Sequence, residues 1–229
     1  MTGTDRRDPK TAVLEATELA IAGMSYDRGL LWLATPEDRL VATYDPVTGT
    51  MAERLVYAHE VWDVAVDSGG FWLVTGGGKL GRRIVLWSLE EERELKQFDC
   101  PDGAASGLTR LQDKLWVAHR HNRKLFCLDA QSGKVNWVIR TDHECFSPAA
   151  YKNELWLIES DPGPLGHWSR AQECRYFFSR FDPGRERIVE RLPVAFAPSC
   201  MAFDGARFWY AEEGKKGFAS TARPLPPRL

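Results

Sequence analysis

A tryptophan recurs along this chain in five similar apolar segments, and this repeat constrains the fold more than any other feature of the sequence. The segments are GLLWLAT, GGFWLVT, DKLWVAH, NELWLIE and ARFWYAE, which place the aromatic residue at Trp32, Trp72, Trp116, Trp156 and Trp209. Successive tryptophans are 40, 44, 40 and 53 residues apart, which is the range typical of a four-stranded propeller blade. The repeat therefore predicts five blades.

Each repeat shows the same order of short elements around its tryptophan. An alternating strand comes first, as in WDVAVD and SCMAFD, and a tight turn rich in Asp, Gly and Asn follows it. After the tryptophan strand, a third strand such as RIVLWSL or KLFCLDA leads through a second turn into a fourth. We therefore expect an all-β protein, a five-bladed β-propeller of four-stranded antiparallel blades.

The two ends of the chain complete this prediction. The last repeat stops after its tryptophan strand and a weak strand candidate, GFASTA, so one strand of the fifth blade is missing there. The segment AVLEATELA precedes the first repeat and can supply that outer strand, which removes an exposed sheet edge. We expect one domain over residues 1–229, with blades over 11–222 and a proline-rich tail over 223–229.

Composition narrows the class of partner. The net charge of -2 argues against nucleic-acid binding, and no stretch has the length of a membrane-spanning helix. The N-terminus MTGTDRRDPK lacks the apolar region of a secretory signal, and five cysteines without a CxxC pair are typical of reduced thiols. We therefore expect a cytoplasmic protein with a small-molecule ligand, no membrane contact, and a protein partner as the alternative.

Parts of the repeat resemble known propeller families. The segment KLFCLDAQSGKVNW resembles the repeat of quinoprotein-type and YVTN-type propellers, with Asp129, Gly133 and Trp137 at matching places. The segment FDGARFWYAEE is similar to the blade of the virginiamycin B lyase group. Five blades are also the number in glutaminyl cyclotransferases. These resemblances imply the propeller fold, and they carry over no cofactor and no catalytic residue.

The candidate site lies at the mouth of the central channel, on the face where the innermost strands begin. Loops on a rigid frame concentrate binding groups, and the histidines all fall in loops of this face: His59, His119, His121, His143 and His167. A His-Glu dipeptide also recurs at the same distance before the second and fourth tryptophans. The catalytic groups that we predict are His59, Glu60, Asp63, His143, Glu144 and Glu159.

Imidazole and carboxylate groups together suit a divalent metal ion or a general acid–base pair near neutral pH. We predict His59 and His143 as the metal ligands, and the sequence indicates no cofactor other than this ion. No HExxH spacing is present. The alternative role for each histidine is a hydrogen bond to neighbouring backbone, and the repeated His-Glu is also explained by duplication of a blade.

A ligand at the same mouth would contact aromatic and polar side chains. The ligand-binding residues that we predict are Trp62, His119, His121, Phe146 and Trp168. Packing between adjacent strands is the alternative role for Phe146. Cys145 and Cys200 border the mouth and would be nucleophiles if a histidine lowered their pKa, whereas buried, inert thiols are the default interpretation.

Three further segments have two interpretations each. Residues 75–79, with Arg82 and Arg83, resemble a phosphate cradle, but no Walker pattern or following helix accompanies them, which favours a plain hairpin. Residues 160–174 form the longest insertion, either a lid over the mouth or a surface excursion. The tail RPLPPRL resembles a ligand for an SH3-type groove, and a tail without a partner is favoured.

Two hypotheses about function follow. The first is a small-molecule enzyme at the channel mouth, a metal-assisted lyase, cyclotransferase or hydrolase, in which histidines act as metal ligands or bases and carboxylates act as acid–base or orienting groups. The second is a non-catalytic scaffold or sensor that binds a protein or a metabolite through the same mouth.

Overall fold

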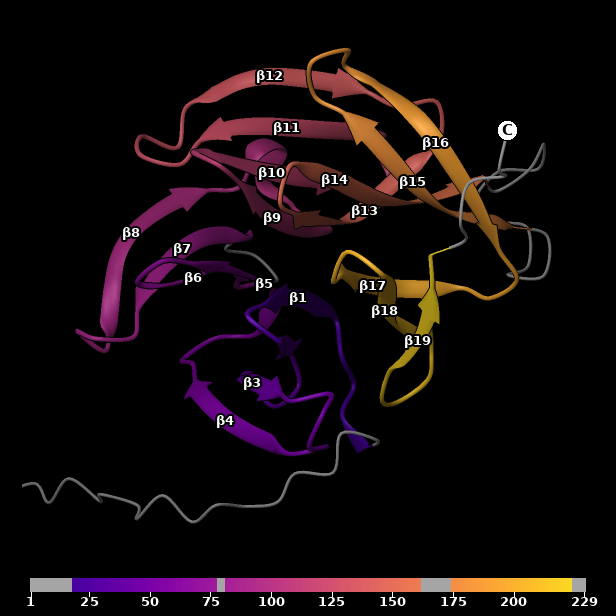
Figure 1. Cartoon of the computed structure of the whole chain (residues 1–229). Helices are drawn as coiled ribbons and strands as arrows, with labels where there is room; N and C mark the ends of the chain where they lie inside the picture. The colour runs from indigo at the N-terminus through magenta and orange to yellow at the C-terminus, as the bar shows by residue number, and fades with distance from the viewer. Residues whose placement is uncertain (1–17, 78–80, 162–173, 224–229) are drawn as a thin grey trace, which may run out of the picture.

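The computed structural model describes residues 18–77, 81–161 and 174–223, and its strands form five antiparallel sheets around one axis (Figure 1). Blade 1 contains β1 (Gly23–Asp27), β2 (Leu30–Thr35), β3 (Leu40–Tyr44) and β4 (Met51–Val56). Blade 2 contains β5 (Val61–Asp67), β6 (Gly70–Thr75), β7 (Arg83–Ser88) and β8 (Arg93–Asp99). Blade 3 contains β9 (Gly107–Leu111), β10 (Lys114–His119), β11 (Lys124–Asp129) and β12 (Val135–Arg140).

The last two blades differ in their number of strands. Blade 4 contains β13 (Glu144–Tyr151), β14 (Glu154–Asp161), β15 (Arg175–Asp182) and β16 (Arg187–Val194). Blade 5 contains β17 (Pro198–Phe203), β18 (Arg207–Glu212) and β19 (Ala219–Ala222), so it has three strands within the described residues. In every blade the strands follow chain order, and the first strand of each blade contacts the first strands of its neighbours. The predicted five-bladed propeller is confirmed.

The tryptophan strands form a buried layer of the molecule, as the repeat predicts. Every residue of β6 is buried, because adjacent strands and adjacent sheets both cover it. Trp72 and Trp156 are at most 1% exposed, and only Trp209, in the three-stranded blade, is half-buried.

In two blades, an aspartate five residues before the tryptophan connects the preceding turn to the tryptophan strand through a hydrogen bond. The indole N–H of Trp72 donates to Asp67 over 3.0 Å, and that of Trp209 donates to Asp204 over 2.8 Å. The same aspartates begin the turns that lead into the tryptophan strands. The recurring Asp in these turns therefore has a structural role as a hydrogen-bond acceptor.

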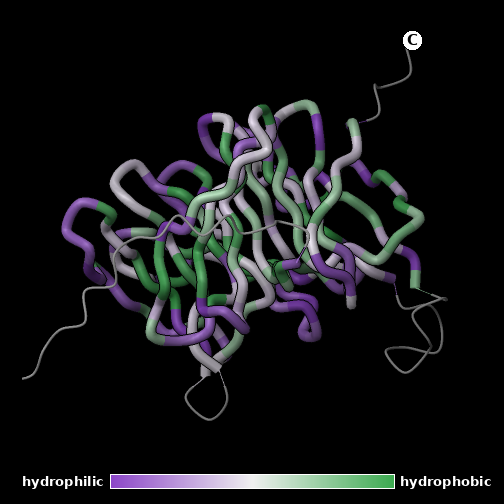
Figure 2. Tube along the Cα trace, turned by 90° about the horizontal axis from the view of Figure 1, so that it is seen from below, coloured by the Kyte–Doolittle hydropathy of each residue, from purple (hydrophilic) through white to green (hydrophobic). Residues whose placement is uncertain are grey.

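Hydropathy divides the propeller into an apolar middle and two polar rims (Figure 2). We call the rim at which the five inner strands begin the N-face, and the rim at which they end the C-face. Both rims consist of turns and loops, where binding groups are exposed on a rigid frame. Within the described residues, no helix has the length and apolar character needed to cross a membrane.

The segment that leads into β1 lies against blade 5. The carbonyl of Leu19 accepts a hydrogen bond from the Gly217 N–H over 2.9 Å, and Leu19 and Ile21 pack with Cys200 and Ala202. The two ends of the propeller therefore meet here, as closure of the ring requires. The predicted outer strand for blade 5 falls mostly on residues 12–17, which lie outside the described residues.

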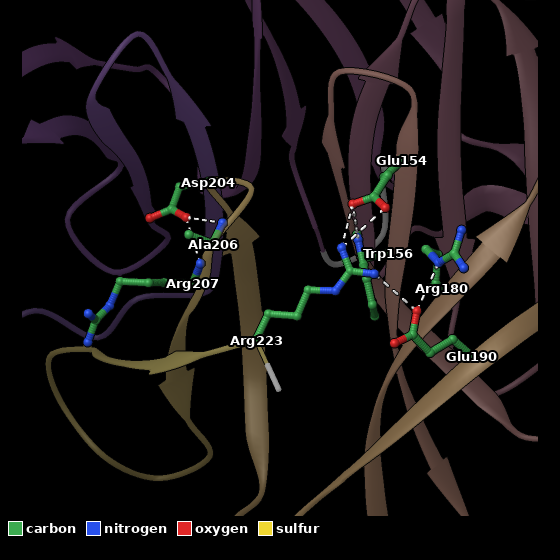
Figure 3. A network of polar contacts seen from close by, with 8 residues as sticks. All are labelled: Glu154, Trp156, Arg180, Glu190, Asp204, Ala206, Arg207 and Arg223. Carbon is green, nitrogen blue, oxygen red and sulfur yellow. Dashed lines mark hydrogen bonds and ion pairs between the residues drawn. The ribbon is translucent and has the colours of Figure 1, made fainter. Parts of the chain in front are cut away.

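Arg223, directly after β19, ties the end of blade 5 to blade 4 (Figure 3). Its guanidinium donates to both carboxylate oxygens of Glu154, over 3.1 and 3.2 Å, and to Glu190 over 3.2 Å. The same group lies 4.8 Å from the ring centre of Trp156. This contact holds the last described strand in place. The remainder of the predicted proline-rich tail, residues 224–229, lies outside the described residues.

Candidate functional site

At the N-face, the inner strands meet in a ring of residues that each lie nine positions before a tryptophan. The ring consists of Gly23, Asp63, Gly107, Ser147 and Cys200. A Cβ atom on Gly23 would overlap the Cα of Asp63, and one on Gly107 would lie 2.7 Å from the Cα of Ser147. Only glycine permits these approaches, since no real Cβ contact is this short.

Asp63 joins blades through this ring. One carboxylate oxygen accepts the Leu108 N–H of blade 3 over 2.7 Å, and the other accepts the Val64 N–H over 2.8 Å. The side chain is 2% exposed, and burial raises its pKa to about 8, against the opposing effect of the N–H groups of Leu108, Val64 and Met24. Asp63 therefore joins neighbouring inner strands, and its predicted catalytic role stays a prediction.

Ser147 repeats this arrangement between blades 4 and 5. Its hydroxyl accepts the Met201 N–H over 2.8 Å, and the thiol of Cys200 lies 3.8 Å from the carbonyl of Ile21. The register of β13 shifts beside Ser147, which has a φ of 44°. Such bulges re-aim single side chains. Together these contacts join the inner strands of neighbouring blades at the N-face.

Two other predicted catalytic carboxylates are also buried in ion pairs. The first, Glu159, is 0% exposed, accepts hydrogen bonds from Arg191 at 2.7 and 3.3 Å, and accepts the Ser179 hydroxyl over 2.6 Å. These partners come from β15 and β16, so Glu159 fastens the strands of blade 4 to one another. The structure gives Glu159 a structural role, and its predicted catalytic role stays a prediction.

The second, Glu144, belongs to a polar cluster between blades 3 and 4. Its carboxylate accepts Arg120 Nε over 3.0 Å and the Ser160 hydroxyl over 3.1 Å, and His121 Nδ1 lies 3.7 Å away. Glu144 is 3% exposed, whereas His121 is exposed. The structure therefore brings two predicted site residues together, with an arginine that the sequence pattern did not indicate.

The predicted aromatic walls of the mouth are covered by arginines. The guanidinium carbon of Arg82 lies 4.2 Å from the ring centre of Trp62, and that of Arg120 lies 4.2 Å from the ring centre of Phe146. The Trp62 indole N–H donates to the Gly76 carbonyl over 2.7 Å, and Phe146 is 2% exposed. These contacts are cation–π pairs within the protein, so packing is the observed role of Phe146. Trp168 lies outside the described residues.

The remaining described histidines each have a different neighbour on the N-face. His143 stacks on Phe177 at 6.2 Å in blade 4, and His59 lies beside Tyr57 at the entrance to blade 2. His119 ends β10 next to Asn122, and burial lowers its pKa. Within the described residues, no group of three or more His, Cys, Asp or Glu side chains is arranged to hold a metal ion. The His59–His143 metal pair stays a prediction.

The buried cysteines do not fit the nucleophile interpretation. Burial raises the pKa of Cys145 and of Cys200 to about 12. A thiol with such a pKa is protonated at neutral pH and is a poor nucleophile. The default interpretation from the sequence, inert core thiols, therefore agrees with their surroundings.

One open feature of the N-face is a pocket of about 430 Å³ between blades 1 and 2. It contains two predicted catalytic residues, His59 and Glu60, both solvent-exposed, and two arginines, Arg39 and Arg83. The glycine-rich loop forms one wall. A Cβ atom on Gly77 would lie 2.7 Å from Glu60 Oε2, so glycine there lets the Glu60 carboxylate approach the loop.

Residues on either side of this loop are held by hydrogen bonds and by a stacking contact. The Gly76 N–H donates to the Glu60 carbonyl over 3.1 Å, and the Gly76 carbonyl accepts the Trp62 indole. Arg82, the residue before β7, stacks on that indole, so the arginine and glycine positions depend on one another. The sequence did not predict the arginines of this face as site residues. For Arg82 and Arg83, the signal in the sequence was their position directly after the glycine-rich segment.

Comparison with known proteins shows the fold. No protein-family model matches this chain, and no curated protein matches it in sequence. The crystal structure of Myxococcus xanthus glutaminyl cyclase is similar with a TM-score of 0.62 and 9% identity, over 94% of this chain and 96% of that one. Kuenenia stuttgartiensis hydrazine synthase is similar with a TM-score of 0.52 and 14% identity, over 92% of this chain.

This chain covers 59% of the hydrazine synthase chain and nearly all of the glutaminyl cyclase chain. Both identities are too low for residue roles to transfer, so the likeness establishes the propeller fold alone. A function must therefore come from the geometry of this chain's own groups.

Proposed function

We propose that this protein is a small-molecule enzyme whose site is the N-face pocket between blades 1 and 2. One observation carries the proposal: an exposed imidazole and an exposed carboxylate, His59 and Glu60, share a pocket of about 430 Å³ with Arg39 and Arg83. That volume is in the range of metabolite sites. Proton-transfer groups and anion-binding groups are thus open to the same ligand.

The other predicted groups support this choice by their burial. Asp63, Glu144 and Glu159 are 0–3% exposed and are bonded to backbone or to arginine. A general acid or base has to reach the proton that it transfers. His59 and Glu60 meet that requirement because both are exposed in the pocket.

The groups in the pocket suggest a division of roles. Arg39 and Arg83 would bind a carboxylate or phosphate group of the substrate. His59 would transfer a proton near neutral pH, and Glu60 would act as the second proton-transfer or orienting group. A lyase, cyclotransferase or hydrolase reaction requires such proton-transfer groups beside the bound substrate. The form of the hypothesis in which His59 and His143 share a metal ion remains a prediction from the sequence.

The test works without a known substrate. Wild-type protein is incubated with a small-molecule extract of its host and, separately, with an N-terminal glutaminyl dipeptide, because one similar structure is a glutaminyl cyclase. Compounds consumed or formed are followed by mass spectrometry. We expect His59→Asn and Glu60→Gln each to slow the conversion at least about 100-fold, and Glu91→Gln, on an exposed turn, to leave it unchanged.

His143→Asn separates the two forms of the hypothesis. Loss of activity in this variant, restored or altered by added divalent metal, would support the metal-assisted form. Full activity would limit the site to the blade 1–2 pocket. Equal conversion by wild type and by His59→Asn would contradict the proposed site.

A second function is favoured by one surface feature. The outermost strand of blade 3, β12, exposes Val135, Trp137 and Val138, which are 38%, 49% and 50% exposed. An apolar patch along a sheet edge is typical of a protein interaction surface. Wild-type protein that converts nothing in the extract, but retains one stoichiometric protein partner that Trp137→Ser releases, would favour a scaffold over an enzyme.

A further inference from the structure

A second cavity, of about 290 Å³, lies on the C-face at the opposite end of the inner strands. Its wall comes from the ends of β1, β5, β9 and β13 and from the turns that follow β1 and β13. Four blades therefore contribute to one central hollow. The polar lining residues are Ser25, Tyr26, Asp27, Arg28, Thr109, Arg110, Tyr151 and Lys152.

Positive charge exceeds negative charge in this wall. The lining contains three cationic side chains, Arg28, Arg110 and Lys152, and one carboxylate, Asp27. Asp27 lies 3.5 Å from Arg28 Nε. Within the described residues, no ion pair involves Lys152, whose ammonium lies 5.2 Å from the ring centre of Tyr151. Arg110 pairs with Asp67, so Lys152 is the lining cation without a carboxylate partner among the described ion pairs.

Arg110 is held in position from behind the cavity. Its Nη1 contacts Asp67 at 2.5 Å, and Asp67 in turn accepts the Trp72 indole over 3.0 Å and the Ser68 N–H over 2.6 Å. The described hydrogen bonds of the Arg110 side chain use only Nη1. The guanidinium is therefore oriented by a part-buried network, and its Nη2 has no described hydrogen bond and is left for a ligand.

Two of the cations occupy unusual turn positions. Arg28 and Lys152 open the two-residue turns after β1 and β13, with φ of 48° and 53°. Asn, Asp and Gly are the residues that such turns favour. Long cationic side chains at these equivalent positions in two blades place positive charge at the rim of the same hollow.

Two tyrosines complete the wall. The ring centres of Tyr26 and Tyr151 are 6.3 Å apart. A Cβ atom on Gly205 of blade 5 would overlap Tyr151 Cε1, so that glycine makes room for the Tyr151 ring. Phenol hydroxyls donate hydrogen bonds to oxyanions. Because both rings are half-buried, their packing limits the movement of this part of the cavity wall.

We propose that the C-face cavity binds a small oxyanion with two or more negative charges, a phosphate-bearing or polycarboxylate metabolite. Lys152 and Arg110 would contact the anion directly, because the ammonium has no ion-pair partner in the described chain and the guanidinium is pre-oriented. The two mouths of this propeller would thus have separate ligands: a substrate off the axis at the N-face and an anion on the axis at the C-face.

The experiment is isothermal titration calorimetry of the full chain with pyrophosphate and, separately, with citrate. We expect one anion per chain at low ionic strength and weaker binding at 0.5 M NaCl, because the site is open to solvent. Binding of pyrophosphate alone or of citrate alone would identify the source of the oxyanion. Lys152→Met should weaken binding at least about tenfold, whereas Lys152→Arg should retain most of it.

Two variants keep the result specific to this cavity. Lys134→Met removes an exposed lysine from a turn outside the cavity and should leave binding unchanged. Arg83→Met tests the N-face pocket. The proposal is overturned if neither anion binds, if Lys152→Met and Lys134→Met have equal effects, or if Arg83→Met abolishes binding while Lys152→Met does not. None of these outcomes depends on enzymatic turnover at His59.

Discussion

The two ends of the propeller axis are built from the same five strands, yet they are opposite in character. At the N-face, glycines bring the strands together until Asp63 and Ser147 bond directly to the backbone of the next blade. At the C-face, four of these strands end around a hollow of about 290 Å³, and tyrosine, arginine and lysine side chains of blades 1, 3 and 4 line it.

The difference shows that side-chain size at one register position decides whether a propeller axis is sealed or open. Small residues and short acceptors seal the contacts between neighbouring inner strands at the N-face. Long polar side chains leave space at the C-face. Stability should therefore depend strongly on the N-face ring and weakly on the C-face wall, and three predictions test that contrast.

The largest effect is expected from Asp63→Ala. This change leaves the buried N–H groups of Leu108 and Val64 without their acceptor, which should lower the free energy of unfolding by about 2–4 kcal/mol. Chemical denaturation measures the loss. Asp45→Ala is the matched control, since Asp45 also accepts two backbone N–H groups but on an exposed turn where water can replace it. Similar losses in both variants would refute a sealed ring.

The next effect is a pH dependence with a defined sign. The Asp63 carboxyl has a pKa of about 8 when folded, against 3.8 for an unperturbed group. Between these values the folded state holds a proton that the unfolded state releases, so this contribution to stability is complete below about pH 4 and is lost as the pH rises toward 8. The slope is at most about 1.4 kcal/mol per pH unit.

Asp63→Asn isolates that slope. Asparagine resembles the protonated carboxyl and does not titrate, so we expect the variant to be less sensitive to pH than wild type between pH 5 and 8, measured by urea denaturation at several pH values. Parallel profiles for the two proteins would show that Asp63 is not the group responsible.

The smallest effect on stability is expected at the C-face. Lys152→Met removes an exposed ammonium without an ion pair in the described chain, so the free energy of unfolding should change by less than about 0.5 kcal/mol, as measured by the same denaturation. A loss as large as that of Asp63→Ala would mean that the C-face wall supports the fold and would remove the contrast between the two ends.

Sequence reasoning succeeded for this protein where the information is local and repeated. The tryptophan strands are short apolar runs, and most of the turns beside them contain Asp, Gly or Asn, so the strands around Trp72 or Trp156 are readable without the fold. The four described histidines also lie at the N-face, as predicted. The neighbours of each were not predictable, because they come from other strands and loops: His59 lies beside Tyr57, and His143 stacks on Phe177.

The chain by itself determined the number of blades, the order of the strands and the layer of buried tryptophans, because strand periodicity and turn chemistry act over a few residues. The tertiary structure alone decided which polar groups are buried and which are open to solvent. Asp63 meets Leu108 across 45 positions of the chain, and Cys200 meets Ile21 across 179. Whether a carboxylate is a reactive group or a fastening between blades depends on such distant partners, since burial and hydrogen bonding set its charge and its access to solvent.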